Sequence, residues 1–184
     1  STEVLHRRLI WKKAYYAAAE VIVPKTKKLI VVSVTLFLLV MLLLPLRHWV
    51  IEDDVLWTEE GHRLSWRMML RSRSGTGTFY VVEKDTRKKT PVYLSHYLSA
   101  KQERSVQSKP DFIWQFAQKL EKIYEGKGKK IEVYADLKVS INGRPGKQFT
   151  DPTVDLTKED WSHFKHHSWI MPSPLYEKKL RLKN

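Results

Sequence analysis

The sequence predicts an α+β protein in which one transmembrane helix precedes a strand-rich extracytoplasmic domain, built on an antiparallel sheet with at least one helix. Three observations support this prediction: an apolar run over residues 29–46, strict apolar–polar alternation over residues 131–142, and helical apolar spacing after Pro110. The 184 residues suit one modest domain beside the apolar run. Because the chain contains no cysteine, disulfides, thiolate metal sites and a cysteine nucleophile are excluded.

The apolar run over residues 29–46 has the length of a membrane span. Eighteen helical residues extend about 27 Å, close to the roughly 30 Å hydrocarbon core of a bilayer. A buried core helix is the alternative, whereas a signal peptide has a shorter apolar region nearer the start. We therefore divide the chain into a cytoplasmic basic segment (1–28), a transmembrane helix (29–46) and an extracytoplasmic domain (47–184).

Charge differs between the two sides of the run, and this difference predicts the orientation. Residues 1–28 are rich in lysine and arginine, whereas residues 47–66 carry mostly carboxylates. Basic residues flank the cytoplasmic side of membrane spans, so the amino terminus is predicted to be cytoplasmic and residues 47–184 periplasmic or lumenal. Trp49 and Trp57 suit the aromatic belt at the outer interface.

The domain is predicted to begin with three strands, interrupted by a turn over residues 74–78, at residues 64–72, 78–83 and 91–94. Alternation along the first strand sends Trp66 and Arg71 to opposite faces. We expect Trp66 to pack in the core and Arg71 to meet a carboxylate.

A helix and a long strand follow. Ser108, Pro110 and Asp111 resemble a helix start, and apolar residues then recur at helical spacing until Gly126. The alternating strand ends at an Asn-Gly turn, which returns the chain through residues 147–150.

The residues themselves carry little recognisable chemistry. The cluster of His163, His166 and His167 matches no metal motif, and we interpret it as a polar rim or interface patch. No triad order or paired carboxylates are recognised, so we predict no catalytic, cofactor-binding or metal-binding residue in this chain.

The net charge of +13 is scattered along the sequence. Nucleic acid is therefore not expected as a partner, whereas anionic lipid or an acidic peptide is.

Several motifs, in order along the chain, resemble the vitamin K-dependent γ-glutamyl carboxylase family, including bacterial homologues with a horizontally transferred transmembrane (HTTM) domain. The densest is residues 54–71, DVLWTEEGHRLSWRMMLR. The others are Leu44-Pro45-Leu46-Arg47-His48, Pro110-Asp111, Asp136, Val139-Ser140-Ile141-Asn142, Arg144, Phe149, Asp151-Pro152, Val154-Asp155, Trp161, Phe164 and Ser168-Trp169. The resemblance covers residues 29–173.

The resemblance implies that the chain is the carboxy-terminal part of an integral membrane carboxylase of the carbon–carbon lyase type. Animal-type members oxidise reduced vitamin K with oxygen and add carbon dioxide to a substrate glutamate, using a lysine in an earlier membrane portion. The chain is thus expected to bind the glutamate substrate and to be inactive alone. Its expected partners are membrane lipid, a glutamate-containing peptide or protein and the missing membrane portion. The alternative is a non-enzymatic, membrane-anchored binding domain.

The resemblance also implies substrate-binding roles for Trp57, His62, Ser65, Trp66, Met69 and Arg71. Animal enzymes resemble this stretch but place a histidine at the position of Arg71. Arginine keeps a positive charge for a carboxylate, but it does not act as a proton shuttle near neutral pH.

Overall fold

The computed structural model describes residues 25–51, 53–63, 65–66, 71–174, 176 and 182. Most of the basic segment over residues 1–28 therefore lies outside the described residues. The chain divides into two compact units between Met41 and Leu42, a boundary that falls inside helix α2 (Lys27–Leu46). The last turn of α2 thus belongs to the second unit, together with the folded domain.

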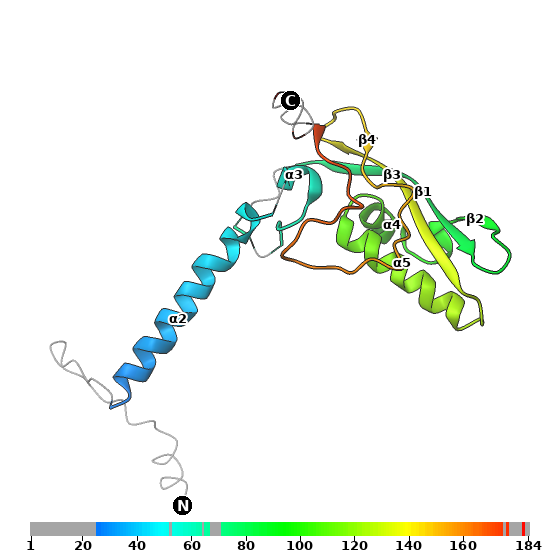
Figure 1. Ribbon diagram of the computed structural model, residues 1–184. Helices are drawn as coiled ribbons and strands as arrows, with labels where there is room; N and C mark the ends of the chain where they lie inside the picture. The colour runs from blue at the N-terminus through cyan, green and yellow to red at the C-terminus, as the bar shows by residue number, and fades with distance from the viewer. Residues whose placement is uncertain are drawn as a thin grey trace, which may run out of the picture. The chain divides into compact units, whose positions relative to one another are not determined.

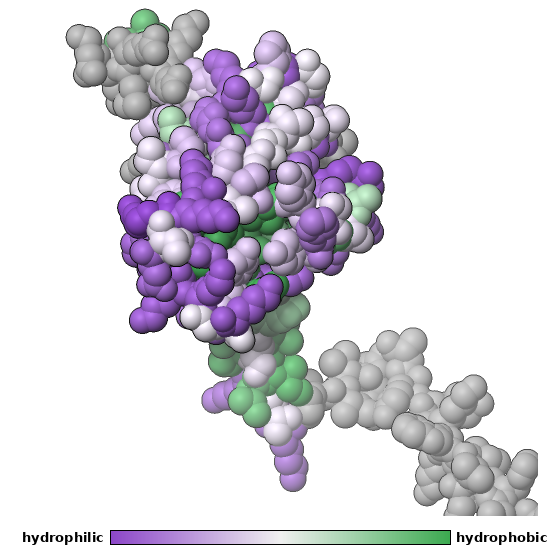
Figure 2. Space-filling view, turned by 90° about the vertical axis from the view of Figure 1, so that its right-hand side faces the viewer, coloured by the Kyte–Doolittle hydropathy of each residue, from purple (hydrophilic) through white to green (hydrophobic). Residues whose placement is uncertain are grey.

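Helix α2 covers the apolar run and is long and apolar enough to cross a membrane. Only 6% of its apolar window is buried. A core helix of a soluble domain would be mostly buried, so the core-helix alternative is not supported. Figure 2 shows α2 as hydrophobic, whereas the visible face of the domain is largely hydrophilic.

The domain is built on a four-stranded antiparallel sheet with the order β2-β1-β3-β4 (Figure 1). The strands are β1 (Arg73–Glu83), β2 (Lys89–Val92), β3 (Ile131–Ile141) and β4 (Lys147–Gln148). β1 and β3 pair over their whole length, with Arg73 opposite Ile141 and Glu83 opposite Ile131. The α+β prediction with an antiparallel sheet is confirmed.

Helices α4 (Ala100–Val106) and α5 (Pro110–Glu125) lie on one side of the sheet (Figure 1). The predicted helical spacing is correct, because Ile113, Phe116 and Leu120 of α5 are buried. Phe116 meets Phe79 of β1 edge to face, with ring centroids 5.1 Å apart. The shorter elements are η1 (Arg47–Trp49), α3 (Val55–Thr58) and η2 (Leu94–His96).

Two local predictions are wrong. The segment over residues 74–78 is not a turn but part of β1. Its Gly75 instead allows a close approach, because a Cβ there would lie 1.8 Å from the carbonyl oxygen of Gln107, in the link between α4 and α5. Ser108 does not cap α5: its hydroxyl donates to the carbonyl of Arg104, and Lys109 is the capping residue.

The strand predicted over residues 64–72 is also wrong where it is described. Ser65 and Trp66 lie in a bend, and the strand begins only at Arg73. Trp66 is 72% exposed, so it does not support the core. The alternation of apolar residues there does not reflect a pleated face, because local hydrogen bonds from Ser65 to the carbonyl of His62 turn the chain.

Beyond the two-residue β4, side chains complete the edge of β3. The Thr150 hydroxyl accepts from the N–H of Leu137 at 3.0 Å and donates to the carbonyl of Ala135 at 2.6 Å. A carboxylate oxygen of Asp155 accepts from the N–H of Val133 at 3.0 Å. These bonds satisfy buried backbone groups that lack a strand partner. They also fasten the carboxy-terminal segment to the sheet.

We expect Thr150→Val to lower the free energy of unfolding by about 1–3 kcal/mol, because it leaves the N–H of Leu137 and the carbonyl of Ala135 buried without their partner. Chemical unfolding of the detergent-solubilised chain measures this change. Thr153→Val is the matched control, because the Thr153 hydroxyl bonds only to Asp151 in an exposed turn. Equal stability of the two variants would contradict the role of Thr150.

Candidate functional site

The turn after α3 is held against the end of α2. Asp54 caps α3 by accepting from the N–H of Leu56 at 2.9 Å, and the helix ends at Glu59, whose φ of 61° is left-handed. Gly61 follows with a φ of +70°, and a Cβ there would lie 2.8 Å from Cβ of His48. Glycine is therefore required where the turn packs on η1.

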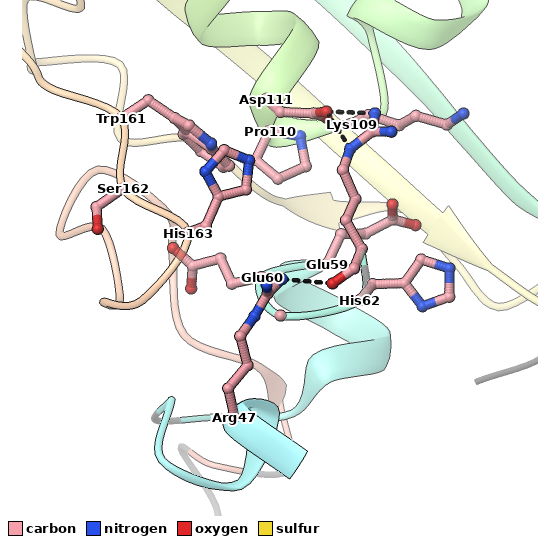
Figure 3. A pocket seen from close by; sticks show the side chains of 12 residues that line it. Arg47, Glu59, Glu60, His62, Lys109, Pro110, Asp111, Trp161, Ser162 and His163 are labelled. Atoms are coloured by element: carbon pink, nitrogen blue, oxygen red, sulfur yellow. Dashed lines mark hydrogen bonds and ion pairs between the residues drawn. The ribbon is translucent and has the colours of Figure 1, made fainter. Parts of the chain in front are cut away.

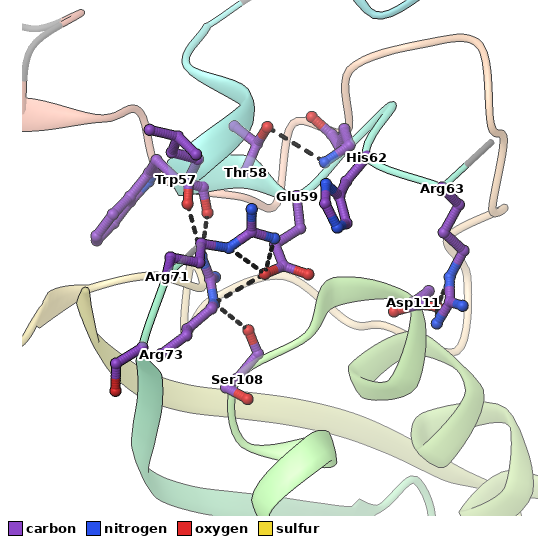
Figure 4. Close-up of polar contacts among 12 residues, drawn as sticks. Trp57, Thr58, Glu59, His62, Arg63, Arg71, Arg73, Ser108 and Asp111 are labelled. Carbon is purple, nitrogen blue, oxygen red and sulfur yellow. Dashed lines mark hydrogen bonds and ion pairs between the residues drawn. The ribbon is translucent and has the colours of Figure 1, made fainter. Parts of the chain in front are cut away.

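Glu59 is the acceptor of a buried charge cluster (Figure 4). Arg71 donates to its Oε1 through Nε at 3.1 Å and also through Nη2, and Nε of Arg73 lies 3.8 Å from the same oxygen. The side chains are 5% exposed for both arginines and 11% for Glu59. Removing one member of such a pair leaves a buried charge uncompensated, so the cluster is first of all structural.

Arg73 joins three segments. It donates to the carbonyls of Trp57 at 2.6 Å and Ser108 at 2.6 Å, and its guanidinium carbon lies 4.6 Å from the ring centroid of Phe149. Burial lowers the pKa of Arg73 to about 10, while Glu59 opposes that effect. The guanidinium therefore remains charged at neutral pH.

The neighbouring Glu60 is bound by two histidines. It accepts from Nδ1 of His166 at 2.6 Å, and from both the backbone N–H (2.8 Å) and Nδ1 (2.5 Å) of His167. Nε2 of His167 accepts from the backbone N–H of Ser162 at 3.0 Å. Since that N–H is only a donor, His167 is the neutral tautomer with its proton on Nδ1. Its ring stacks on Trp161 with centroids 4.4 Å apart.

A small pocket opens beside this turn, and Figure 3 shows Arg47 reaching into it from the end of α2. Its volume is about 60 Å³. It is lined by residues of the turn, the start of α5 and the segment around Trp161: Arg47, Glu59, Glu60, Gly61, His62, Arg63, Lys109, Pro110, Asp111, Trp161, Ser162 and His163. A volume of this size holds a few water molecules or one carboxylate.

The three carboxylates in the lining already have cationic or imidazole partners. Glu59 binds Arg71, Glu60 binds the two histidines, and Asp111 accepts from Nε of Arg63 at 2.7 Å. Unlike these carboxylates, Arg47 is only partly satisfied. Its Nη2 donates to the carbonyl of Arg63, but its buried Nε and Nη1 have no hydrogen-bond partner among the described residues. The pocket can therefore offer an N–H donor of Arg47 to an anion.

The predicted site residues separate into three groups. His62 lines the pocket and Ser65 donates to its carbonyl. Trp57 is buried with its indole N–H on the carbonyl of Met171, and Arg71 meets a carboxylate of its own chain, Glu59. The structure thus gives Trp57 and Arg71 internal partners, and it does not bear out the aromatic-belt prediction for Trp57. Trp66 is exposed. Met69 lies outside the described residues.

Several site residues were missed from the sequence. Arg47, Glu59, Glu60 and Arg73 were not predicted, and His166 and His167 were interpreted only as a polar patch. The sequence signals for Arg47 were its position directly after a long apolar run and its place in the motif over residues 44–48. Nothing in the sequence indicated that Glu60 meets histidines more than a hundred positions later.

The pocket does not fit the reduced vitamin K that the resemblance implies. Its volume of about 60 Å³ is far below the roughly 300 Å³ of pockets that hold larger organic ligands. Half of its lining residues are charged, whereas a quinol ring requires mainly apolar and aromatic groups.

We expect Glu60→Gln to lower the free energy of unfolding at neutral pH and to make that free energy less dependent on pH in the acidic range. Burial raises the pKa of Glu60, but hydrogen bonds from His166 and His167 outweigh burial and hold that pKa below its ordinary value. Its stabilisation is therefore present above about pH 4.3 and is lost as the pH falls through the lower folded-state pKa. Unfolding between pH 3 and pH 7 measures this, with exposed Glu125→Gln as the control. Parallel pH curves for Glu60→Gln and the unmutated chain would contradict the assignment.

Comparison with known proteins gives the family. No solved structure matches this chain. The family model described as "Vitamin K-dependent gamma-carboxylase, lumenal domain" matches residues 26–175, which include α2, the sheet and every residue of the pocket. The chain therefore belongs to the vitamin K-dependent gamma-carboxylase lumenal domain family.

Proposed function

We propose that this portion of a carboxylase-like membrane protein binds the glutamate side chain of a peptide substrate, and that the Arg47 pocket receives the carboxylate. The single observation that carries the proposal is the pair of buried donors, Nε and Nη1 of Arg47, that have no partner among the described residues. A buried donor without an acceptor is destabilising by about 1–3 kcal/mol. A carboxylate from a substrate satisfies one of these donors through a charge-assisted hydrogen bond to the guanidinium.

The rest of the lining suits the same ligand. His62 and Lys109 add neutral or positive donors. The three lining carboxylates already have partners, Arg63 among them, which reduces their repulsion of an incoming anion. The size of the pocket favours one side-chain carboxylate over a larger acid.

In this proposal the oxidative chemistry belongs to residues outside this chain. The resemblance associates quinol activation with an earlier membrane portion, and the poor fit of the pocket to a quinol supports that division. Oxygen and carbon dioxide are proposed co-substrates of the complete protein, and the earlier membrane portion is the proposed partner of this domain. We propose that lipid, a glutamate-bearing peptide and that membrane portion are the partners of the complete protein.

We expect Arg47→Gln, in the full chain reconstituted in nanodiscs, to weaken binding of a glutamate-bearing peptide by about tenfold or more, because a charge-assisted hydrogen bond is lost. Arg47→Lys is expected to retain part of the affinity, since it keeps the charge without the planar fork. Fluorescence anisotropy of a labelled peptide measures both.

Two controls make this test specific. Arg104→Gln removes an exposed charge on α4 and is expected to bind as the unmutated chain does. The same peptide with glutamine in place of glutamate is expected to bind weakly to every variant. Equal affinity for the two peptides, or normal binding by a folded Arg47→Gln variant, would refute the proposal.

We further propose that the amino terminus is cytoplasmic and that the domain faces the lumen or periplasm. Lys25, Lys27 and Lys28 precede the apolar run directly, whereas Asp53, Asp54 and Glu59 follow it. This asymmetry supports the orientation through the preference of basic residues for the cytoplasmic side.

A reporter enzyme that is active only after export tests the orientation. Fused after Asn184, it is expected to be active, whereas a reporter that works only in the cytoplasm is expected to be silent there. Cytoplasmic activity at this position would show the opposite topology.

A further inference from the structure

Two loops of the domain carry large aromatic side chains that the fold leaves uncovered. Trp66 is 72% exposed and Phe164 is 67% exposed. Neither supports the core, and the pocket lining includes neither of them. Exposed aromatic residues at one place on a domain usually mark a surface that contacts another molecule or a membrane.

Arg47 places both loops at the end of α2. It is the first residue after Leu46, where α2 ends. Its Nη2 donates to the carbonyl of Arg63, three residues before Trp66, and its guanidinium carbon lies 5.5 Å from the ring centroid of Phe164. These contacts lie within the second compact unit, which begins at Leu42.

The end of α2 itself is apolar and exposed. Leu42 and Leu43 are 49% and 60% exposed. Trp49, the last residue of η1, is 74% exposed, and Val50 directly after it is 83% exposed. Apolar side chains are therefore exposed within a few residues of Arg47, which contacts both loops. Aromatic side chains are enriched at this depth of a bilayer, because an apolar ring and polar neighbours suit the headgroup boundary.

We infer that Trp66 and Phe164, together with Trp49, rest in the lipid surface of the leaflet in which α2 ends. We call these three residues the aromatic footprint. The footprint anchors the domain at fixed height and tilt, which keeps the mouth of the Arg47 pocket near the membrane. Lys165, exposed beside Phe164, is placed to meet lipid phosphates. This inference does not depend on what the pocket binds.

The absence of cysteine makes the test direct, because one introduced cysteine carries the only label. Phe164→Cys and Trp66→Cys, each labelled with an environment-sensitive fluorophore, are prepared as the full chain in nanodiscs. Doxyl groups on the lipid chains and iodide in the water report which medium each label contacts. Asp85→Cys, at the exposed tip between β1 and β2, is the matched control.

We expect labels at 164 and 66 to be quenched by doxyl lipid and protected from iodide, and the label at 85 to behave in the opposite way. Quenching of the first two labels by iodide, as at 85, would overturn the inference. Protection from both quenchers would also overturn it, because a peptide or protein segment, not lipid, would then cover the loops.

A second measurement places the label at position 165, so that proteins with and without the Phe164 ring can be compared. A label on Lys165→Cys is compared with the same label in the presence of Phe164→Ser, and doxyl quenching is expected to fall by about twofold or more as the loop leaves the interface. Tyr93→Ser, which removes an aromatic ring that is 67% exposed elsewhere, is expected to leave the quenching unchanged. Unchanged quenching with Phe164→Ser would overturn the inference even if the labels at 164 and 66 contact lipid.

Discussion

The structure of the domain near the end of α2 depends on one buried constraint, the binding of Glu59 by Arg71 and Arg73. Arg73 contacts the end of α3, the link between α4 and α5, and the ring of Phe149 at the same time. Because its charge is buried, each of these acceptors must stay in place. The turn that carries Glu60, Gly61 and His62 is held by this cluster on one side and by η1 on the other.

The adjacent acids Glu59 and Glu60 in this turn bind different partners. Glu59 binds arginines from the start of β1, whereas Glu60 binds histidines from the carboxy-terminal segment. The left-handed backbone at Glu59 sends the two side chains toward different parts of the domain. Two neighbouring carboxylates thereby bring three distant stretches of the chain together, and the pocket lies between those stretches.

Membership of the carboxylase lumenal domain family and the character of the pocket are consistent with the proposed roles, in which this domain binds the substrate and another part of the protein carries out the oxidative chemistry. The pocket is small, charged and close to the end of an apolar helix, which suits recognition of an acidic side chain better than quinol chemistry. In the inferred arrangement, the exposed aromatic residues near the same helix end hold this pocket at a membrane surface.

The sequence was sufficient for those features that depend on local periodicity. Alternation identified β3, helical spacing identified α5, and the length of the apolar run identified α2, because each pattern reflects one element and one face. The sequence was insufficient where the secondary structure of a segment depends on contacts with distant parts of the chain. Gly75 and its neighbours suggested a turn, yet they lie in β1, where they pair with β3. The glycine at position 75 leaves room for the connection between α4 and α5.

The same distinction between sequence and tertiary structure applies to the candidate site. The sequence by itself marked residues 54–71 as unusual and related them to a family. It also predicted His62 as a site residue, and the structure places His62 in the pocket lining. Only the tertiary structure decided that Arg71 belongs to an internal ion cluster, that Trp66 is exposed and that Arg47 enters a pocket. The physical reason is that a charged or aromatic side chain is assigned its role by its partners. The partners of Arg47 and Glu60 lie 16 to 117 positions away along the chain, and they contact these two residues only in the folded domain.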